Sequence, residues 1–137
     1  MTANRQLSII LPSKNEAVSL ATLLPELKRQ APDAEIIVVN DGSTDDTVSV
    51  CDVCQVRVIS HPYCKGNGAS IKTGARAANG EILLFMDADG QHQPEDIPLL
   101  LQKLDQGYDM VVGARGKGSQ ASVHRSVGNK IYNRLAS

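Results

Sequence analysis

Two carboxylates separated by one residue, Asp87 and Asp89, follow directly after an apolar run and are the side chains in this sequence best suited to chemistry. Gln91 adds a neutral oxygen two positions further on. Carboxylate and amide oxygens are hard ligands of the kind that Mg²⁺ and Mn²⁺ prefer, and these ions commonly bridge to substrate phosphates. The pattern therefore predicts a divalent-metal site that takes a phosphorylated ligand.

The same Asp-x-Asp-Gly pattern also suits a tight turn whose acids cap a following helix. The preceding residues, 82–86, are apolar throughout and are typical of a buried strand. Because a capped turn does not require two acids to leave a buried strand, the context favours the metal site. The residues alone leave both interpretations open.

Polar residues also follow three other apolar runs. The polar segments that directly follow these runs span residues 12–16, 40–43 and 115–118, and two of the three carry further carboxylates. In an open α/β sheet, ligands bind outside the carboxyl ends of the strands. Carboxylates crowded at one edge repel one another unless a cation or hydrogen-bond donors compensate. We therefore expect a functional site at this edge of the sheet.

Five short apolar runs predict the strands that position these residues. They cover residues 7–11, 35–40, 56–59, 81–86 and 110–114. Their nearly continuous apolar character is typical of strands buried on both faces of a parallel sheet. Because helical patterns alternate with them, the chain is expected to form a three-layer α/β domain with a mostly parallel sheet.

Apolar residues at helical spacing predict one helix around residues 20–27 and another around 97–104. Pro25 falls inside the first pattern and is expected to kink or restart that helix. Ser43 or Thr44 is expected to cap the helix between the second and third strands.

A helix of small residues, about 69–78, is expected before the fourth strand. Gly74 in this segment would permit close packing of the helix on the sheet.

The composition limits the class of protein. The 137 residues suit one compact domain, and a net charge of −1 lacks the basic excess of nucleic-acid-binding proteins. No apolar run approaches the ~20 residues that span a bilayer, and no signal-peptide core is present, so we expect a cytoplasmic location. An odd number of cysteines, three, favours free thiols over a disulfide framework.

Cys51, Cys54, His61 and Cys64 can be counted as a Cys₃His zinc set. Against it, Cys51 and Cys54 fall on a predicted helix, where cysteines pack as small hydrophobic residues. A predicted strand also separates the two pairs. The pattern therefore favours structural cysteines over zinc ligands.

Taken in order along the chain, these motifs resemble family 2 glycosyltransferases, in particular the branch that glycosylates dolichyl or polyprenyl phosphate. Together they extend over nearly the whole chain, which makes the combination more specific than any one motif. The matching segments are LPSKNE (11–16), VNDGSTDDT (39–47), KGNGA (65–69), KTG (72–74), MDADGQHQPED (86–96) and VGAR (112–115). The resemblance implies a GT-A fold, a Rossmann-like α/β/α domain that binds nucleotide sugars.

The resemblance also assigns roles to individual residues. It assigns the divalent ion, Mg²⁺ or Mn²⁺, to Asp87, Asp89 and Gln91. It assigns catalysis to Asp89, Arg115 and Arg125, and the guanidinium groups of the two arginines suit phosphate oxygens. The donor-binding residues it implies are Pro12, Asn15, Glu16, Asp41, Lys65, Asp87, Ala88 and Asp89, with Asp41 at the nucleobase edge.

The implied activity is a metal-dependent, inverting sugar transfer from a UDP- or GDP-linked donor to a lipid phosphate. An acceptor phosphate has a second pKa near ~6, so it carries an attacking oxyanion at neutral pH and needs positive groups rather than a base. The full-length protein would then work at the cytoplasmic face of a membrane. An exposed sheet edge would favour a homo-oligomer.

Complete members of this family carry further elements. We therefore expect residues 1–115 to form the donor-binding core and 116–137 to begin an incomplete acceptor-side loop and helix. Asn40 stands where many relatives have a second Asp, and Gly90 replaces a frequent apolar residue. Two alternatives remain: a fragment that binds nucleotide sugar without transfer, and a nucleotidyltransferase-like enzyme. The latter would be favoured by a glycine-rich loop after the first strand, which residues 12–16 lack.

Overall fold

A computed structural model of the chain describes residues 5–89, 93–108, 113–114 and 122–123. The chain divides into two compact units, Arg5–His92 and the remaining residues. The first unit contains the sheet and is described first.

Four parallel strands form the sheet of the first unit, in the order β3-β2-β1-β4. Their bounds are Leu7–Ser13 for β1, Glu35–Asn40 for β2, Arg57–Ser60 for β3 and Ile82–Phe85 for β4. The central strands β1 and β2 are almost entirely buried, as the apolar runs predicted. The predicted α/β fold with a parallel sheet is confirmed.

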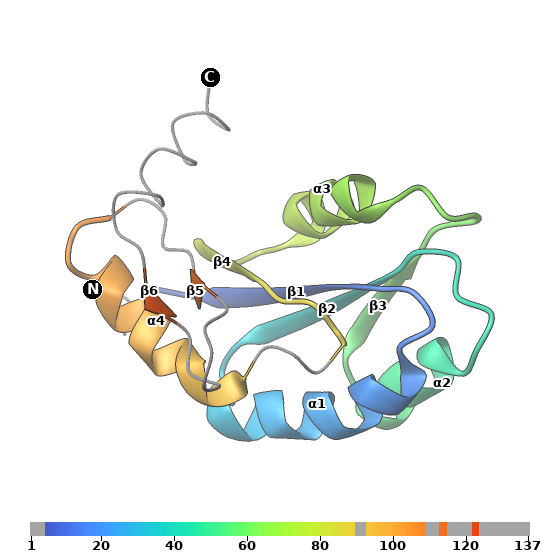
Figure 1. The fold of residues 1–137 in the computed structure, drawn as a ribbon, viewed down its shortest axis with the longest axis horizontal. Coiled ribbons are helices and arrows are strands. Elements are labelled where there is room, and N and C mark those ends of the chain that lie inside the picture. The colour runs from blue at the N-terminus through green and yellow to red at the C-terminus, as the bar shows by residue number, and fades with distance from the viewer. Residues whose placement is uncertain (1–4, 90–92, 109–112, 115–121, 124–137) are drawn as a thin grey trace. The chain divides into compact units, whose positions relative to one another are not determined.

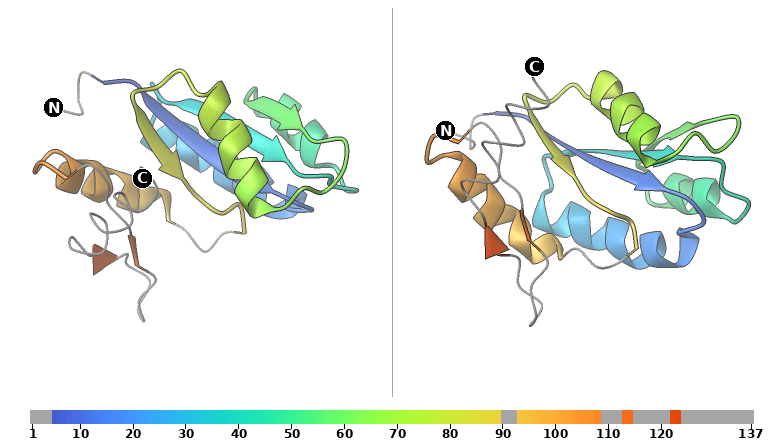
Figure 2. Two further views of the ribbon diagram at one scale, coloured as in Figure 1. Left: turned by 90° about the horizontal axis from the view of Figure 1, so that it is seen from above. Right: turned by 45° about the horizontal axis from the view of Figure 1, so that its top comes forward.

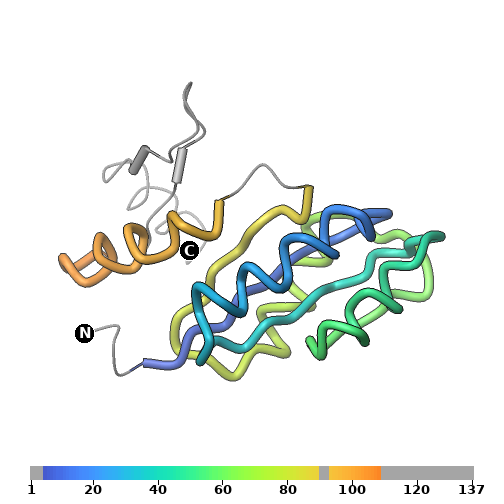
Figure 3. Tube along the Cα trace, turned by 90° about the horizontal axis from the view of Figure 1, so that it is seen from below, coloured from blue at the N-terminus to red at the C-terminus, as the bar shows by residue number. Residues whose placement is uncertain are grey.

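Helices cover both faces of this sheet, which gives three layers (Figure 1). Helices α1 (Ala17–Gln30) and α2 (Thr47–Val53) lie side by side on one face (Figure 3). Helix α3 (Asn67–Ala77) lies on the other face, across β1 and β2 (Figure 2).

Helix α1 runs unbroken through Pro25, so of the expected kink or restart at this proline the restart is wrong. The leucine stripe of this helix, residues 20–27, is buried as its spacing predicted. Burying a leucine side chain contributes about 2 kcal/mol, and four of them outweigh the hydrogen bond that one proline removes.

Gly74 brings α3 close to β1. A Cβ atom at this position would lie 2.3 Å from Cγ2 of Ile10, which is fully buried. The predicted role of Gly74 in close packing is confirmed. The helix itself begins two residues earlier than expected, at Asn67, after Gly66 with φ +100°.

The second unit is described only in part. A 3₁₀ turn (Pro94–Asp96) leads into α4 (Ile97–Leu104), which matches the predicted helix. Strand β5 (Gly113–Ala114) pairs antiparallel with β6 (Ser122–Val123). The fifth predicted strand, 110–114, is thus a strand at Gly113–Ala114, and its residues 110–112 lie outside the described residues. Only residues 115–121 separate β5 from β6, and a parallel crossover needs a dozen or more.

Across the described ranges, no helix combines the length and apolar character that a membrane span requires.

Candidate functional site

The loops that follow β1, β2 and β3 gather at one edge of the sheet, because parallel strands all end on the same side (Figure 1). The strand pairing continues into these loops. The Asp41 N–H donates to the Ser13 carbonyl at 2.9 Å, and the His61 N–H donates to the Asn40 carbonyl at 2.9 Å. The polar residues after each strand are thereby held at a common edge.

Asp45 links the starts of α1 and α2. Its Oδ2 accepts the Ala17 N–H at 3.0 Å, and its Oδ1 accepts the Thr47 N–H at 3.1 Å and the Thr47 hydroxyl. The Thr47 hydroxyl is the main cause of a lowered pKa at Asp45; slight burial opposes it, and backbone N–H donors add to it. The expected cap at Ser43 or Thr44 is wrong, because these two residues bond Asn15 instead.

Asn15, which the resemblance assigned to the donor, joins the first two loops. Its backbone N–H donates to the Ser43 hydroxyl at 2.9 Å, and its Oδ1 accepts the Thr44 N–H at 2.8 Å. Its φ of +55° is a left-handed conformation that asparagine tolerates better than most residues. These contacts fix the shape of the loop between β1 and α1.

Asp41 lies at the centre of a second set of contacts, which we call the Asp41 cluster: Asp41, His61, Cys64, Lys65 and Gly66. The Asp41 residue is 6% exposed. Its Oδ1 accepts the Lys65 N–H at 2.7 Å and lies 2.9 Å from His61 Nδ1. Its Oδ2 accepts the Gly66 N–H at 2.9 Å and the Cys64 thiol at 3.4 Å.

These donors determine the charge of Asp41. Burial by itself raises the pKa of a carboxyl, and here it is the largest single influence. The bonds from His61, from the Lys65 and Gly66 backbone and from the Cys64 thiol together outweigh it, so the pKa of Asp41 lies well below its usual range. Asp41 is therefore an anion in the folded protein at neutral pH.

His61 connects Asp41 to helix α3. Its Nε2 lies 2.8 Å from the Thr73 hydroxyl, while Nδ1 faces the carboxylate. An ionised carboxylate only accepts hydrogen bonds, so Nδ1 carries a proton. Sequence reasoning missed His61 as a partner of Asp41, and Thr73 as a partner of His61. The position of His61 directly after β3, at the same edge as Asp41, is the signal that would have found the first of them.

The cysteines and His61 do not form the zinc set. Both ring nitrogens of His61 already have partners, and burial raises the pKa of the Cys51 thiol to about 11, with smaller contributions from Cys54 and Asp52. Over the part of the chain that the structure describes, no three histidine, cysteine or acidic side chains are grouped to hold a metal.

Asp87 and Asp89 follow β4 at the carboxyl edge. The Met86 N–H still donates to the Ile10 carbonyl at 3.0 Å, so the chain leaves the sheet just before the two acids. Ala88 between them is buried, Asp87 is half-buried and Asp89 is exposed. The carboxylate oxygens of Asp87 and Asp89, on either side of buried Ala88, are hard ligands of the kind that Mg²⁺ or Mn²⁺ prefers. Gln91, Arg115 and Arg125 lie outside the described residues.

The other predicted donor residues lie at the same edge. Pro12 is half-buried near the end of β1, and half-buried Glu16 precedes α1. Lys65 is exposed, with its ammonium 5.4 Å from the centre of the Tyr63 ring. The backbone of Lys65 thus belongs to the Asp41 cluster, while its side chain faces solvent.

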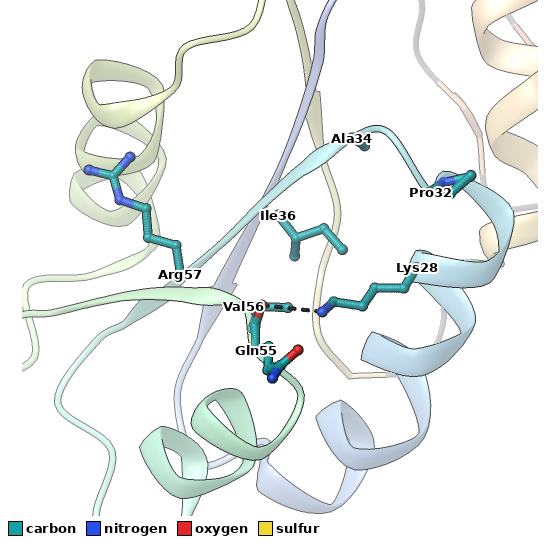
Figure 4. A pocket seen from close by; sticks show the side chains of 7 residues that line it. All are labelled: Lys28, Pro32, Ala34, Ile36, Gln55, Val56 and Arg57. Atoms are coloured by element: carbon teal, nitrogen blue, oxygen red, sulfur yellow. Dashed lines mark hydrogen bonds between the residues drawn. The ribbon is translucent and has the colours of Figure 1, made fainter.

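A shallow pocket lies at the opposite, amino edge of the sheet (Figure 4). Ile36 lies beneath it, and Lys28 reaches across it to donate to the Gln55 carbonyl at 3.2 Å. It contains none of the predicted site residues.

Comparison with known proteins shows which proteins this chain is similar to. The profile of the family described as "Glycosyl transferase family 2" matches residues 8–136. The undecaprenyl-phosphate 4-deoxy-4-formamido-L-arabinose transferase of Photorhabdus laumondii is 32% identical, over 96% of this chain and 43% of the relative. The enzyme of the same name from Klebsiella pneumoniae strain 342 is 33% identical, with the same coverage. The chain spans less than half the length of these relatives.

Comparison with solved structures also finds glycosyltransferases. Glucosyl-3-phosphoglycerate synthase from Mycobacterium tuberculosis in complex with phosphoglyceric acid is 28% identical with a TM-score of 0.72, over 85% of this chain and 46% of that one. The complex of this enzyme with Mn²⁺ and UDP-glucose is 27% identical with a TM-score of 0.69, over 80% and 43%. These are GT-A enzymes, and the chain described here belongs to glycosyl transferase family 2 and has the GT-A fold.

Proposed function

We propose that this chain binds the nucleotide-sugar donor of a metal-dependent, inverting glycosyltransferase whose acceptor is a polyprenyl phosphate. The observation that carries the proposal is that Asp87 and Asp89 leave β4 at the edge where the loops after β1, β2 and β3 also end. The names of the relatives, which are undecaprenyl-phosphate sugar transferases, support the acceptor class.

Asp87 and Asp89 would hold Mg²⁺ or Mn²⁺, with Gln91 as a third ligand. The ion, when bound, offsets the negative charge of the donor diphosphate. Solved neighbours that contain UDP with Mn²⁺ or Mg²⁺ support this assignment and favour uridine over guanosine. Pro12, Asn15, Glu16, Asp41, Lys65 and Ala88 complete the proposed donor site.

In the transfer itself, an oxygen of the acceptor phosphate attacks the anomeric carbon of the sugar. The bond from that carbon to the donor diphosphate breaks, its electron pair leaves with the nucleoside diphosphate, and the configuration inverts. Because the acceptor is already an anion at neutral pH, no protein base has to remove a proton. Arg115 and Arg125 are proposed to orient that phosphate by bidentate hydrogen bonds.

The remaining expectations belong to the whole protein. Residues 1–115 are proposed as the donor-binding core and 116–137 as the beginning of the acceptor side. For the whole protein we propose work at a membrane surface, because the proposed acceptor is a lipid phosphate, and specifically at the cytoplasmic face. Self-association along an edge of the sheet is expected in sedimentation velocity as a dimer whose fraction rises with concentration.

A thermal-shift panel tests donor binding. UDP-sugars and GDP-sugars are each added with and without Mn²⁺, and a true donor at 100 times its Kd raises the free energy of unfolding by about 2.7 kcal/mol. We expect the shift with a UDP-sugar in the presence of Mn²⁺. If no nucleotide sugar raises the melting temperature under either condition, the proposed function is wrong.

A chain that binds donor without transferring sugar is the second candidate, because it matches only 43% of the length of its curated relatives. Transfer of labelled sugar to undecaprenyl phosphate separates the two. In the full-length protein, Arg125→Ala is expected to raise the KM for lipid phosphate and to lower kcat with donor affinity nearly unchanged. If this substitution leaves KM and kcat unchanged, Arg125 does not belong to the acceptor site.

A further inference from the structure

We propose that residues 43–45 position Glu16 for the donor, and that Asp45 is the principal positioning residue among them. This inference rests on the proposed donor binding, in which Glu16 is a donor residue. It gives a role to Asp45, which has none there.

The residue before Glu16 is bound to the loop after β2 by two hydrogen bonds. The Asn15 N–H donates to the Ser43 hydroxyl at 2.9 Å, and its Oδ1 accepts the Thr44 N–H at 2.8 Å. Asn15 has φ +55°, a left-handed conformation that costs free energy in most residues and persists only where the surroundings impose it. The loop after β2 supplies those surroundings.

The residue after Glu16 is bound to the same loop through Asp45. The Ala17 N–H donates to Asp45 Oδ2 at 3.0 Å. The Glu16 carbonyl accepts the Leu20 N–H at 2.9 Å, and Leu20 is fully buried in the core. Glu16 therefore lies between two bonded neighbours at an anchored helix start, so its backbone has little freedom.

Asp45 is itself held by the start of α2. Its Oδ1 accepts the Thr47 N–H at 3.1 Å and the Thr47 hydroxyl, and Thr47 is fully buried. Because Asp45 is a carboxylate at neutral pH, these bonds are charge-assisted and stronger than bonds between neutral groups. One side chain thus connects the start of α2 to the residue that follows Glu16.

The Glu16 side chain is not used to build this arrangement. Glu16 is half-buried, and as the residue before α1 it makes no side-chain capping bond to that helix. The backbone at this position is therefore fixed while the carboxylate remains open to a ligand. A ligand-binding group on a backbone fixed in advance loses less conformational entropy when the ligand binds.

Calorimetric titration of UDP with Mn²⁺ into the whole chain tests the role of Asp45. Asp45→Asn retains one of the two acceptors and Asp45→Ala retains neither, so affinity should fall in the order wild type, Asp45→Asn, Asp45→Ala. We expect a loss of about tenfold in Asp45→Ala, because apparent affinity falls with the fraction of molecules in the binding-competent shape. Unchanged affinity in Asp45→Ala would overturn the inference.

A double-mutant cycle shows whether Asp45 acts through Glu16. Glu16→Ala should weaken UDP by itself, and Asp45→Ala added to Glu16→Ala should then cause a further loss of less than about twofold. A further loss of the full size seen in Asp45→Ala alone would show that Asp45 acts independently of Glu16, which contradicts the proposal.

Asp46 provides a matched control for charge. It is the next residue in the chain, it is exposed, and its side chain makes no capping bond to α2. Asp46→Asn removes the same negative charge as Asp45→Asn, so it should leave the affinity for UDP unweakened. Equal losses in the two variants would attribute the effect to charge and overturn the positioning role.

Asn15 gives a second test that does not depend on the folding of the Asp45 variants. Asn15→Gly still permits the left-handed backbone but removes the acceptor for the Thr44 N–H. It should weaken UDP by about threefold to tenfold, and this loss should disappear in the Glu16→Ala background. A loss that persists there would mean that Asn15 does not act through Glu16, contrary to the inference.

A ligand-free measurement distinguishes this inference from the proposed function. If wild-type protein does not bind UDP with Mn²⁺, the proposed function fails. Amide hydrogen exchange then tests the positioning alone: the Ala17 amide should be protected in wild type and lose protection in Asp45→Ala. Equal exchange of this amide in the two proteins would overturn the positioning role itself.

Discussion

Asp41, Asp45 and Asn15 show that polar residues at a ligand-binding edge also build that edge. The Asp45 carboxylate accepts the first backbone N–H of two helices, and Asn15 joins two loops. From the sequence, Asn15 and Asp41 were expected at the edge, because the strands that precede them were predicted from apolar runs. The sequence did not indicate most of their hydrogen-bond partners, because these lie 20 or more residues away in the chain, as His61 does from Asp41 and Ala17 from Asp45.

The lowered pKa values make a prediction about acid stability. Asp41, Asp45 and Glu35 all have a pKa below the ordinary value in the folded state. Such groups stabilise the fold fully above their unfolded pKa of about 4, and this contribution is lost as pH falls through the folded values. Urea unfolding should show that Asp41 alone accounts for about 1 kcal/mol of the stability lost between pH 6 and pH 3.

Asp41→Asn is therefore expected to be less stable than wild type at neutral pH. Its free energy of unfolding should also fall less steeply than that of wild type between pH 6 and pH 3. Asp52→Asn, on the exposed surface of α2, should keep the wild-type slope. Identical slopes for Asp41→Asn and wild type would contradict the assignment of a depressed pKa to Asp41.

At the scale of helices and strands, the periodicity of apolar residues predicted the elements whose apolar residues are buried. It did not predict features that depend on contacts between elements. Strands β1 to β4 and the leucine stripe of α1 were predicted correctly, because both depend on local apolar pattern. The predicted restart at Pro25 was wrong, since burial of that stripe holds α1 together. The pairing of the fifth strand with β6 was not predicted, because an apolar run does not specify which strand it pairs with.

Helix α3 offers a test of packing at two glycines. Gly74→Ala places a methyl group against fully buried Ile10 and should lower the free energy of unfolding by about 1–3 kcal/mol. Gly68 lies in the same helix, and a methyl group added there would meet no other atom within 4 Å, so Gly68→Ala should raise the free energy of unfolding by up to about 1 kcal/mol. Urea denaturation giving both substitutions the same sign would contradict the close packing of α3 on β1.

For the whole molecule, the order of motifs along the chain identified the family before any contact was known. Parallel strands place every exit loop at one edge, so a sequence that shows the strands also shows where the site lies. The acceptor side could not be derived in this way. Its proposed residues, Arg115 and Arg125, come after the region in which strands and helices alternate regularly. The sequence pattern therefore does not predict what surrounds them.

The central claim is that Asp87 and Asp89 bind a nucleoside diphosphate through a divalent ion. Calorimetric titration of UDP into the chain with Mn²⁺, and again with excess EDTA, tests it most directly. We expect binding with Mn²⁺, a loss of more than about tenfold in EDTA, and a similar loss in Asp89→Asn with the melting temperature of the free protein unchanged. Equal affinity for UDP with and without the metal, or in Asp89→Asn and wild type, would contradict the account.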